Sequence, residues 1–258
     1  MAGPIVSAPL PIDTVLGDVR NALRTHGTGV LVAAPGAGKT TRVPLALLDE
    51  PWRDGGKIIV LEPRRIAARA AAERLAATLG TRLGDRVGLR ARLASKTSAN
   101  VAIEVVTEGV FTRMILDDPE LSGVAAVLFD EFHERSLDAD LGLALALDTR
   151  GALRPDLKIL VMSATLEASR VAKLLGDAPV IASDGRTFPI ETRHIGRRAQ
   201  RIEDDVVDAV RRALERDTGS ILVFLPGQGE ITRVADRLHA LDLPQTIDIA
   251  PLYGALDP

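Results

Sequence analysis

The chain has 258 residues, of which 46% are hydrophobic and 26% charged, and its net charge is −3. This balance is that of a globular protein, and it excludes disorder, collagen and coiled coil for the whole chain, as well as a surface that is basic throughout. The absence of cysteine excludes disulfides and thiolate zinc sites and suits a reducing cytoplasm, which is the predicted location. No apolar run approaches the ~20 residues of a membrane span, and the first ten residues lack the pattern of a secretory signal.

Short runs of Val, Ile and Leu alternate with helical segments along the first two thirds of the chain. Apolar residues recur at helical spacing from Ile12 to Leu23 and predict an amphipathic helix that ends near Gly27. Strands are predicted at 29–33, 57–61, 101–106, 124–129, 157–162 and 179–182, and further helices at 39–48, 66–79, 109–116, 137–147 and 168–175. Continuous apolar strands that alternate with helices predict an α/β fold, in which a parallel sheet is covered by helices on both faces.

The pattern changes after Asp184, and we predict two domains there, 1–184 and 185–258. The second region opens with mixed charges and a proline at 185–200, read as a crossing strand plus linker. Helices at 202–214 and 230–241 and strands at 220–225 and 247–252 follow. Because a typical sheet has about five or six strands, this second domain is expected to be incomplete.

The segment Ala33–Thr40 reads AAPGAGKT and is typical of a phosphate-binding loop, although Ala33 stands where the usual pattern has glycine. Gly36 and Gly38 allow the backbone to turn its N–H groups toward a phosphate. The helix that follows adds the positive end of its dipole. Lys39 can reach the terminal phosphates, and the Thr40 hydroxyl can bind Mg²⁺. The residues expected to bind the nucleotide are Gly36, Ala37, Gly38, Lys39, Thr40 and Thr41.

An acidic pair, Asp130 and Glu131, ends the strand at 124–129. Hydrolysis of a nucleoside triphosphate needs charge neutralisation and a positioned water more than covalent chemistry. Asp130 is therefore predicted to face Mg²⁺, and Glu131 to face the γ-phosphate. His133 has no second His or Cys nearby, so we interpret it as a polar relay rather than as a metal ligand.

Polar residues follow each of five predicted strands. They lie at 36–40, 63–65, 107–109, 130–133 and 163–165. In open parallel sheets, ligands bind beyond the carboxyl ends of the strands, which meet at one edge. The sequence therefore predicts one functional site at this edge.

The stretch Asp130-Glu131-Phe132-His133 resembles the DEAH/DExH box of superfamily 2 helicases. Residues 130–135, together with 10–12, resemble most a bacterial subgroup of DEAH-type RNA helicases. Other stretches resemble further motifs of the family: 63–68 resembles motif Ia, 107–109 motif Ib, 163–165 motif III, and 224–227 with the helix from 230 motif IV.

This resemblance implies a RecA-like parallel sheet sandwiched by helices, followed by an incomplete second RecA-like lobe. It implies ATP and Mg²⁺ as cofactors and single-stranded RNA as the partner, with DNA possible and no membrane. By resemblance, Glu131, Asp130, Lys39 and His133 are the catalytic residues, and Thr40 and Asp130 hold the Mg²⁺. The residues implied to contact nucleic acid are Arg64, Arg65, Thr107 and Gly109, and those implied to couple nucleotide state to RNA are Ser163 and Thr165.

The function expected from these features is an ATP-dependent RNA helicase, which hydrolyses ATP to move on RNA or to unwind it. The family's motifs V and VI are absent before Pro258, so we expect an N-terminal fragment with weak or no hydrolysis of its own. Two alternatives remain. One is a P-loop ATPase motor of another class that acts on protein, and the other is a nucleotide-dependent binding protein. The sequence does not indicate the oligomeric state.

Overall fold

The computed structural model describes residues 9–92, 94–164, 168–184, 189–196, 201–241, 243–244 and 246–253. The chain divides into two compact units, Met1–Phe188 and Pro189–Pro258. Thr165, which the sequence assigns to coupling, lies outside the described residues.

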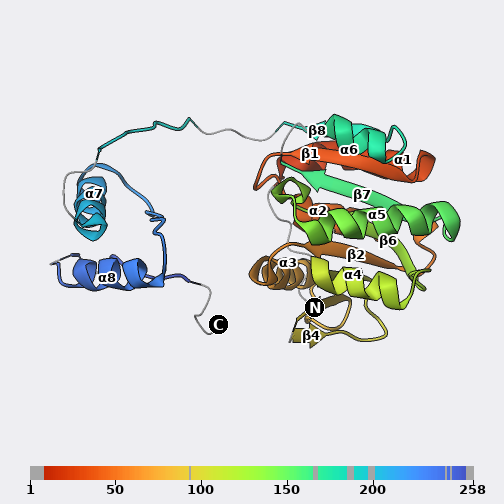
Figure 1. Ribbon diagram of the computed structural model, residues 1–258, viewed down its shortest axis with the longest axis horizontal. Helices are drawn as coiled ribbons and strands as arrows, with labels where there is room; N and C mark the ends of the chain where they lie inside the picture. Colours follow the sequence, from red (N-terminus) through yellow and green to blue (C-terminus); the bar gives the residue numbers. More distant parts are fainter. Residues whose placement is uncertain are drawn as a thin grey trace. The chain divides into compact units, whose positions relative to one another are not determined.

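The first unit is built on one eight-stranded sheet with the order β4-β3-β5-β2-β6-β7-β1-β8 (Figure 1). All neighbouring strands are parallel except β3 and β4, which are antiparallel. The predicted parallel α/β sheet is therefore confirmed. The strands are β1 (Thr28–Ala33), β2 (Lys57–Glu62), β3 (Val87–Ala91), β4 (Ala94–Lys96), β5 (Ile103–Thr107), β6 (Val124–Phe129), β7 (Lys158–Ser163) and β8 (Val180–Ser183).

Helices cover both faces of this sheet. The α-helices are α1 (Leu16–Thr25), α2 (Lys39–Ala46), α3 (Arg65–Thr78), α4 (Glu108–Asp117), α5 (Leu137–Ala152) and α6 (Ala168–Leu174), and the short 3-10 helices are η1 (Pro11–Val15), η2 (Pro51–Arg53) and η3 (Phe132–Glu134). One buried apolar cluster joins α1, α2 and α3 to the sheet, and a second joins α4, α5 and α6 to the other face. Within β1, Leu31 belongs to the first cluster and Val30 to the second. Burial on both faces explains why the strands read as continuous apolar runs.

Strands β3 and β4, which form one edge of the sheet, were not predicted from the sequence. β3 contains Gly88 and Arg90, and all three residues of β4 are exposed. Neither strand therefore shows the buried apolar run by which the other strands were predicted. The predicted first helix also starts differently, because Pro11–Val15 forms the 3-10 helix η1 ahead of α1.

The second unit contains two amphipathic helices, α7 (Ile202–Arg216) and α8 (Gln228–His239). They pack through Val210, Val234 and Leu238, and Arg233 of α8 pairs with Glu203 of α7 at 2.5 Å.

The predicted strands at 220–225 and 247–252 are wrong, because the structure has no strand at the described positions of either segment. Leu222 and Phe224 are exposed. An apolar run forms a strand only where a neighbouring strand pairs its backbone, and no described residue of this unit does so. Residues 189–196 contain no strand either, and the remainder of 185–200 lies outside the described residues.

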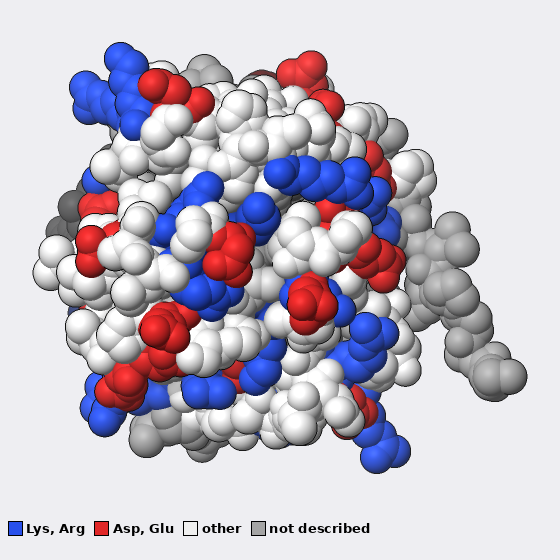
Figure 2. Space-filling model, turned by 90° about the vertical axis from the view of Figure 1, so that its right-hand side faces the viewer, with Lys and Arg blue, Asp and Glu red and all other residues white. Residues whose placement is uncertain are grey.

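No helix among the described residues combines the length and apolarity needed to cross a membrane. Figure 2 shows that Lys and Arg are interspersed with Asp and Glu over the described residues of one face. This mixture agrees with the small net charge of −3.

Candidate nucleotide and nucleic-acid site

The loop between β1 and α2 has the strand–turn–helix geometry of a phosphate-binding loop. Gly36 and Gly38 have φ angles of +76° and +100°, which side chains rarely allow. A Cβ atom on Gly38 would also lie 2.7 Å from Leu10 Cδ1. The backbone path into α2 thus depends on glycine at this position, and it places the N-terminus of α2 at the carboxyl edge of the sheet.

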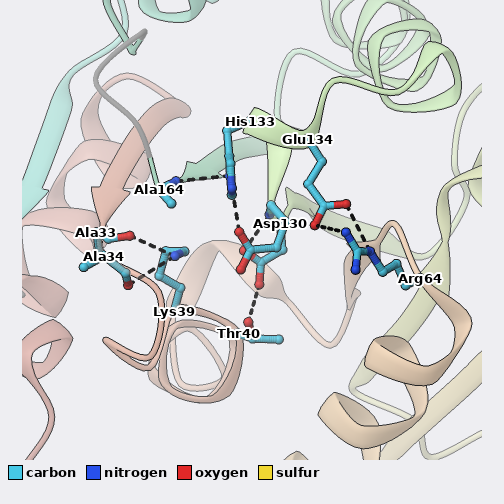
Figure 3. A network of polar contacts seen from close by, with 10 residues as sticks. Ala33, Ala34, Lys39, Thr40, Arg64, Asp130, His133, Glu134 and Ala164 are labelled. Carbon is cyan, nitrogen blue, oxygen red and sulfur yellow. Dashed lines mark hydrogen bonds and ion pairs between the residues drawn. The ribbon is translucent and has the colours of Figure 1, made fainter. Parts of the chain in front are cut away.

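Lys39, the first residue of α2, lies inside this loop. Its side chain is buried, and Nζ donates to the carbonyl oxygens of Ala33 at 2.9 Å and Ala34 at 3.5 Å (Figure 3). The ammonium group is therefore held at the mouth of the loop, where it can exchange these neutral acceptors for phosphate oxygens. Hydrogen bonds between charged partners are the stronger ones.

Replacing Lys39 with alanine is expected to weaken ATP binding about 100-fold, because a charge-assisted contact with the phosphates is lost. Titration with a fluorescent ATP analogue measures this loss. Lys173→Ala, which removes an exposed lysine of α6, is the matched control and should bind the analogue like the parent. Equal affinity in the Lys39→Ala variant and the parent would show that this loop does not hold the phosphates.

Asp130 joins the acidic pair to the phosphate loop. Its Oδ2 accepts a hydrogen bond from the Thr40 hydroxyl, and its Oδ1 accepts one from the Glu131 N–H at 2.8 Å (Figure 3). Burial of the carboxyl group raises the pKa of Asp130, whereas the Thr40 hydrogen bond acts to lower it. The two segments that the sequence predicts to converge therefore do so, across β1 and β6.

Glu131 and His133 contact each other beside Asp130. The Oε2 of Glu131 is 3.3 Å from the Nδ1 of His133, and the Ala164 N–H donates to that same nitrogen at 3.3 Å (Figure 3). Ala164 directly follows Ser163, the last residue of β7. His133 thus lies between the acidic pair and the segment after β7.

Glu62, the last residue of β2, is a site residue that was not predicted from the sequence. Its side chain is buried, and the negative charge of the Asp130 carboxylate favours the protonated form of Glu62. Burial, followed by the negative charges of Asp130, Glu131 and Glu134, raises the pKa of Glu62 to about 8. An acid that ends an apolar run of Ile, Ile, Val and Leu was the available signal.

The residues predicted to contact nucleic acid lie at the ends of β2 and β5, which are neighbouring strands in which Glu62 pairs with Thr107. Arg64 precedes α3, and its guanidinium donates to both carboxylate oxygens of Glu134 at 3.0 and 3.3 Å (Figure 3). Arg65 is exposed at the start of α3, Thr107 is buried before α4, and Gly109 lies in the first turn of α4. The structure thus brings this group to the same edge as the acidic pair.

A pocket of about 440 Å³ opens at this edge, within the size range of ligand sites. Thr40 and Thr41 line it from the phosphate loop, and Glu131 lines it from the acidic pair. Its remaining wall comes from Glu134 of η3, the end of β2 and the segment that follows it, and the alanine-rich face of α3. The pocket therefore adjoins the phosphate loop and the acidic pair, which are the groups expected to bind a triphosphate.

The profile of the DEAD/DEAH box helicase family matches residues 18–174. The chain belongs to this family. Its phosphate loop, acidic pair and the segment ending at Ser163 all fall within the matched region. The family and the RecA-like α/β core predicted from the sequence are thereby confirmed.

The chain is similar to two RNA helicases of Escherichia coli. The chain is 51% identical to the ATP-dependent RNA helicase HrpB of Escherichia coli (strain K12) over 96% of its length, and this match covers 30% of HrpB. It is 36% identical to the ATP-dependent RNA helicase HrpA of the same organism over 99% of its length, covering 20% of HrpA. The chain therefore spans less than a third of the length of either relative.

A solved structure shows the same similarity. The crystal structure of the Escherichia coli DEAH/RHA helicase HrpB matches with a TM-score of 0.89 and 51% sequence identity, over 96% of this chain and 31% of that one. This agrees with the bacterial DEAH-type subgroup expected from the residues of the acidic box.

Proposed function

We propose that this chain is the ATP-binding part of an ATP-dependent RNA helicase. Residues 1–184 form its first RecA-like domain, and 185–258 form the start of the second. The observation that carries the proposal is the hydrogen bond from Thr40 to Asp130, which joins the phosphate loop to the acidic box. The identity of 51% to a bacterial RNA helicase supports the choice of RNA. We also propose a cytoplasmic location.

The residues around Thr40 and Asp130 fit a magnesium ion. A hydroxyl and a carboxylate oxygen lie in contact, and both are the hard ligands that Mg²⁺ prefers. Among the described residues, no cluster of three or more His, Asp or Glu could hold a metal by itself. A magnesium ion held by one or two protein oxygens and by substrate phosphates does not need such a cluster. When bound, the ion would supply charge neutralisation for the phosphates.

The protein's own groups account for the remaining chemistry. The loop amides from Gly36 to Thr41 and the Lys39 ammonium bind and orient the phosphates. Glu131 orients the attacking water and accepts its proton as the water oxygen bonds to the γ-phosphorus. The bond from the γ-phosphorus to the bridging oxygen breaks, and ADP leaves. The Nδ1 atom of His133 lies 3.3 Å from both the Glu131 carboxylate and the Ala164 nitrogen. With its hydrogen on Nδ1 the ring donates to Glu131, and with its hydrogen on Nε2 it accepts from the Ala164 N–H, so it makes one of these bonds at a time. A shift of Ser163 and Ala164 on hydrolysis would therefore reach the acidic pair through one histidine.

RNA is proposed to bind through its backbone at Arg64, Arg65, Thr107 and Gly109. Such contacts are sequence-tolerant and salt-sensitive. Arg64 is engaged by Glu134, so a phosphate has to displace this carboxylate. Since Glu134 follows Glu131 by three residues, RNA binding would act directly on the turn that carries the catalytic acid.

Arg64→Ala is expected to lower affinity for single-stranded RNA several-fold, because one phosphate contact is lost. The slope of log K against log salt should fall by about 0.7, the value for one contact to a single strand. Fluorescence anisotropy at three salt concentrations measures both quantities. Arg113→Ala, which removes an exposed arginine of α4, should leave both unchanged. An unaltered slope in Arg64→Ala would remove Arg64 from the proposed RNA contacts.

The decisive experiment measures ATP hydrolysis by the full-length protein in three parallel reactions, without nucleic acid, with single-stranded RNA and with single-stranded DNA. Stimulation of hydrolysis by RNA supports the proposal. Equal stimulation by DNA would extend the proposed partner to single-stranded DNA. Hydrolysis that neither nucleic acid alters would favour a P-loop motor that acts on protein. Nucleotide binding without hydrolysis would favour a nucleotide-dependent binding protein.

A further inference from the structure

The turn that carries the acidic box has an unusual backbone. Glu131 and Arg135 have φ angles of +48° and +51°, in the left-handed region that residues other than glycine rarely adopt. They flank the 3-10 helix η3, which consists of Phe132, His133 and Glu134. Such a conformation persists only where the surrounding structure holds it. Contacts of η3 with the rest of the domain must therefore hold Glu131 in the left-handed conformation.

Backbone hydrogen bonds close the turn but do not anchor it to the domain. The Glu134 N–H donates to the Glu131 carbonyl at 2.9 Å, and the Arg135 N–H donates to the Phe132 carbonyl at 3.3 Å. Within η3, His133 is partly exposed and Glu134 is exposed. Phe132 is only 5% exposed and belongs to the apolar cluster under α4 and α5. It is thus the one side chain of η3 that enters the core.

The Phe132 ring is held from two sides. It packs edge-to-face on Phe129 of β6 with a centroid distance of 6.3 Å, and Phe129 packs in the same way on Phe111 of α4 at 5.8 Å. Edge-to-face pairs of this kind favour one ring orientation. On the other side, the Arg135 guanidinium lies 5.7 Å from the ring centroid, and it is itself paired with Asp140 at 2.9 Å. The ring is therefore fixed in place between the sheet and Arg135.

We infer that Phe132 is a positioning residue for ATP hydrolysis. Its ring anchors η3 to the core, and this holds Glu131 in the left-handed conformation that directs the carboxylate toward the nucleotide pocket. This inference rests on the proposed function, because it assigns Glu131 the role of orienting water. Phosphate binding belongs to Lys39 and Thr40 on α2, so loss of the anchor should slow hydrolysis without weakening ATP binding.

The test combines kinetics with hydrogen exchange in the full-length protein. Phe132→Ala should lower kcat about 10- to 100-fold, since a displacement of ~1 Å at a catalytic group can cost ~100-fold. The affinity for a non-hydrolysable ATP analogue should stay within about twofold. Amide exchange at residues 131–135 should accelerate in the same variant. Phe132→Leu retains a large apolar side chain. In this variant, kcat and the amide exchange at residues 131–135 should stay close to those of the parent.

Phe111→Leu is the matched control, because it shortens the other end of the same aromatic stack. It should lower thermal stability but leave kcat and exchange at residues 131–135 unchanged. If Phe132→Ala does not fold, Phe132→Val must still lower kcat at least about fivefold.

Exchange at residues 131–135 that is unaltered by truncation of Phe132, or hydrolysis at the parent's rate, would overturn the inference. A parent protein that hydrolyses no ATP would instead remove the proposed function, and exchange at the turn would still decide whether Phe132 anchors it.

Discussion

Glu131→Gln is expected to lower the kcat of ATP hydrolysis by about 10²- to 10⁴-fold, the range typical of general acid–base groups. The substitution keeps the size of the side chain and removes its ability to accept a proton from water. Because Glu131 contacts neither Lys39 nor Thr40 in any hydrogen bond of the described site, ATP affinity should stay close to that of the parent. Steady-state hydrolysis and equilibrium binding of an ATP analogue measure the two quantities separately.

The matched control for this prediction is Glu73→Gln. It makes the same chemical change on an exposed side chain of α3 that pairs with Arg69. It should hydrolyse ATP at close to the parent's rate. Equal rates in Glu131→Gln and the parent would contradict the catalytic role of Glu131 and favour a binding protein without hydrolysis of its own.

The fold was predictable where a strand buries both faces. The strands β2, β6 and β7 are central, and each reads as an unbroken apolar run that local inspection detects. The edge strand β4 is exposed, so its sequence carries no such signal. The segment 220–225, by contrast, was predicted to be a strand and forms none. It has the apolar pattern of a strand, but strand formation depends on a pairing partner that the segment's own sequence does not specify.

The site shows the same division between local and long-range information. The phosphate loop and the acidic box are contiguous in sequence, so their chemistry could be predicted from residue types and spacing. An acid at the end of an apolar run marks Glu62, but its proximity to Asp130 could not be predicted, because it arises from the strand order, which places β2 directly beside β6. The ion pair between Arg64 and Glu134 was missed for the same reason, since 70 residues separate its members along the chain.

Glu62 also determines how the stability of the first unit depends on pH. The pKa of Glu62 is about 8 in the folded chain, against 4.5 for an ordinary glutamate. Between these values the folded state holds a proton that the unfolded state has lost, so the free energy of unfolding falls as pH rises. Each pKa unit corresponds to about 1.4 kcal/mol, so the loss between pH 5.5 and pH 8 should be roughly 3 kcal/mol. The carboxyls of Asp118 and Asp156 have lowered pKa values and titrate below this window.

Glu62→Gln should weaken this dependence, because the amide has no titratable proton. The part that remains should come from Asp130 and Glu108, whose pKa values are also raised by burial. The variant should match the parent near pH 5 and exceed it in stability at pH 8. Urea unfolding followed by the fluorescence of Trp52, the single tryptophan, reports on the first unit at each pH. Glu104→Gln is the contrasting control, since Glu104 is buried beside Arg90 and Lys57 and its loss should destabilise the fold at pH 8. Parallel pH curves for Glu62→Gln and the parent would mean that Glu62 holds no proton beside Asp130, and that the folded domain keeps both carboxylates charged by some other contact.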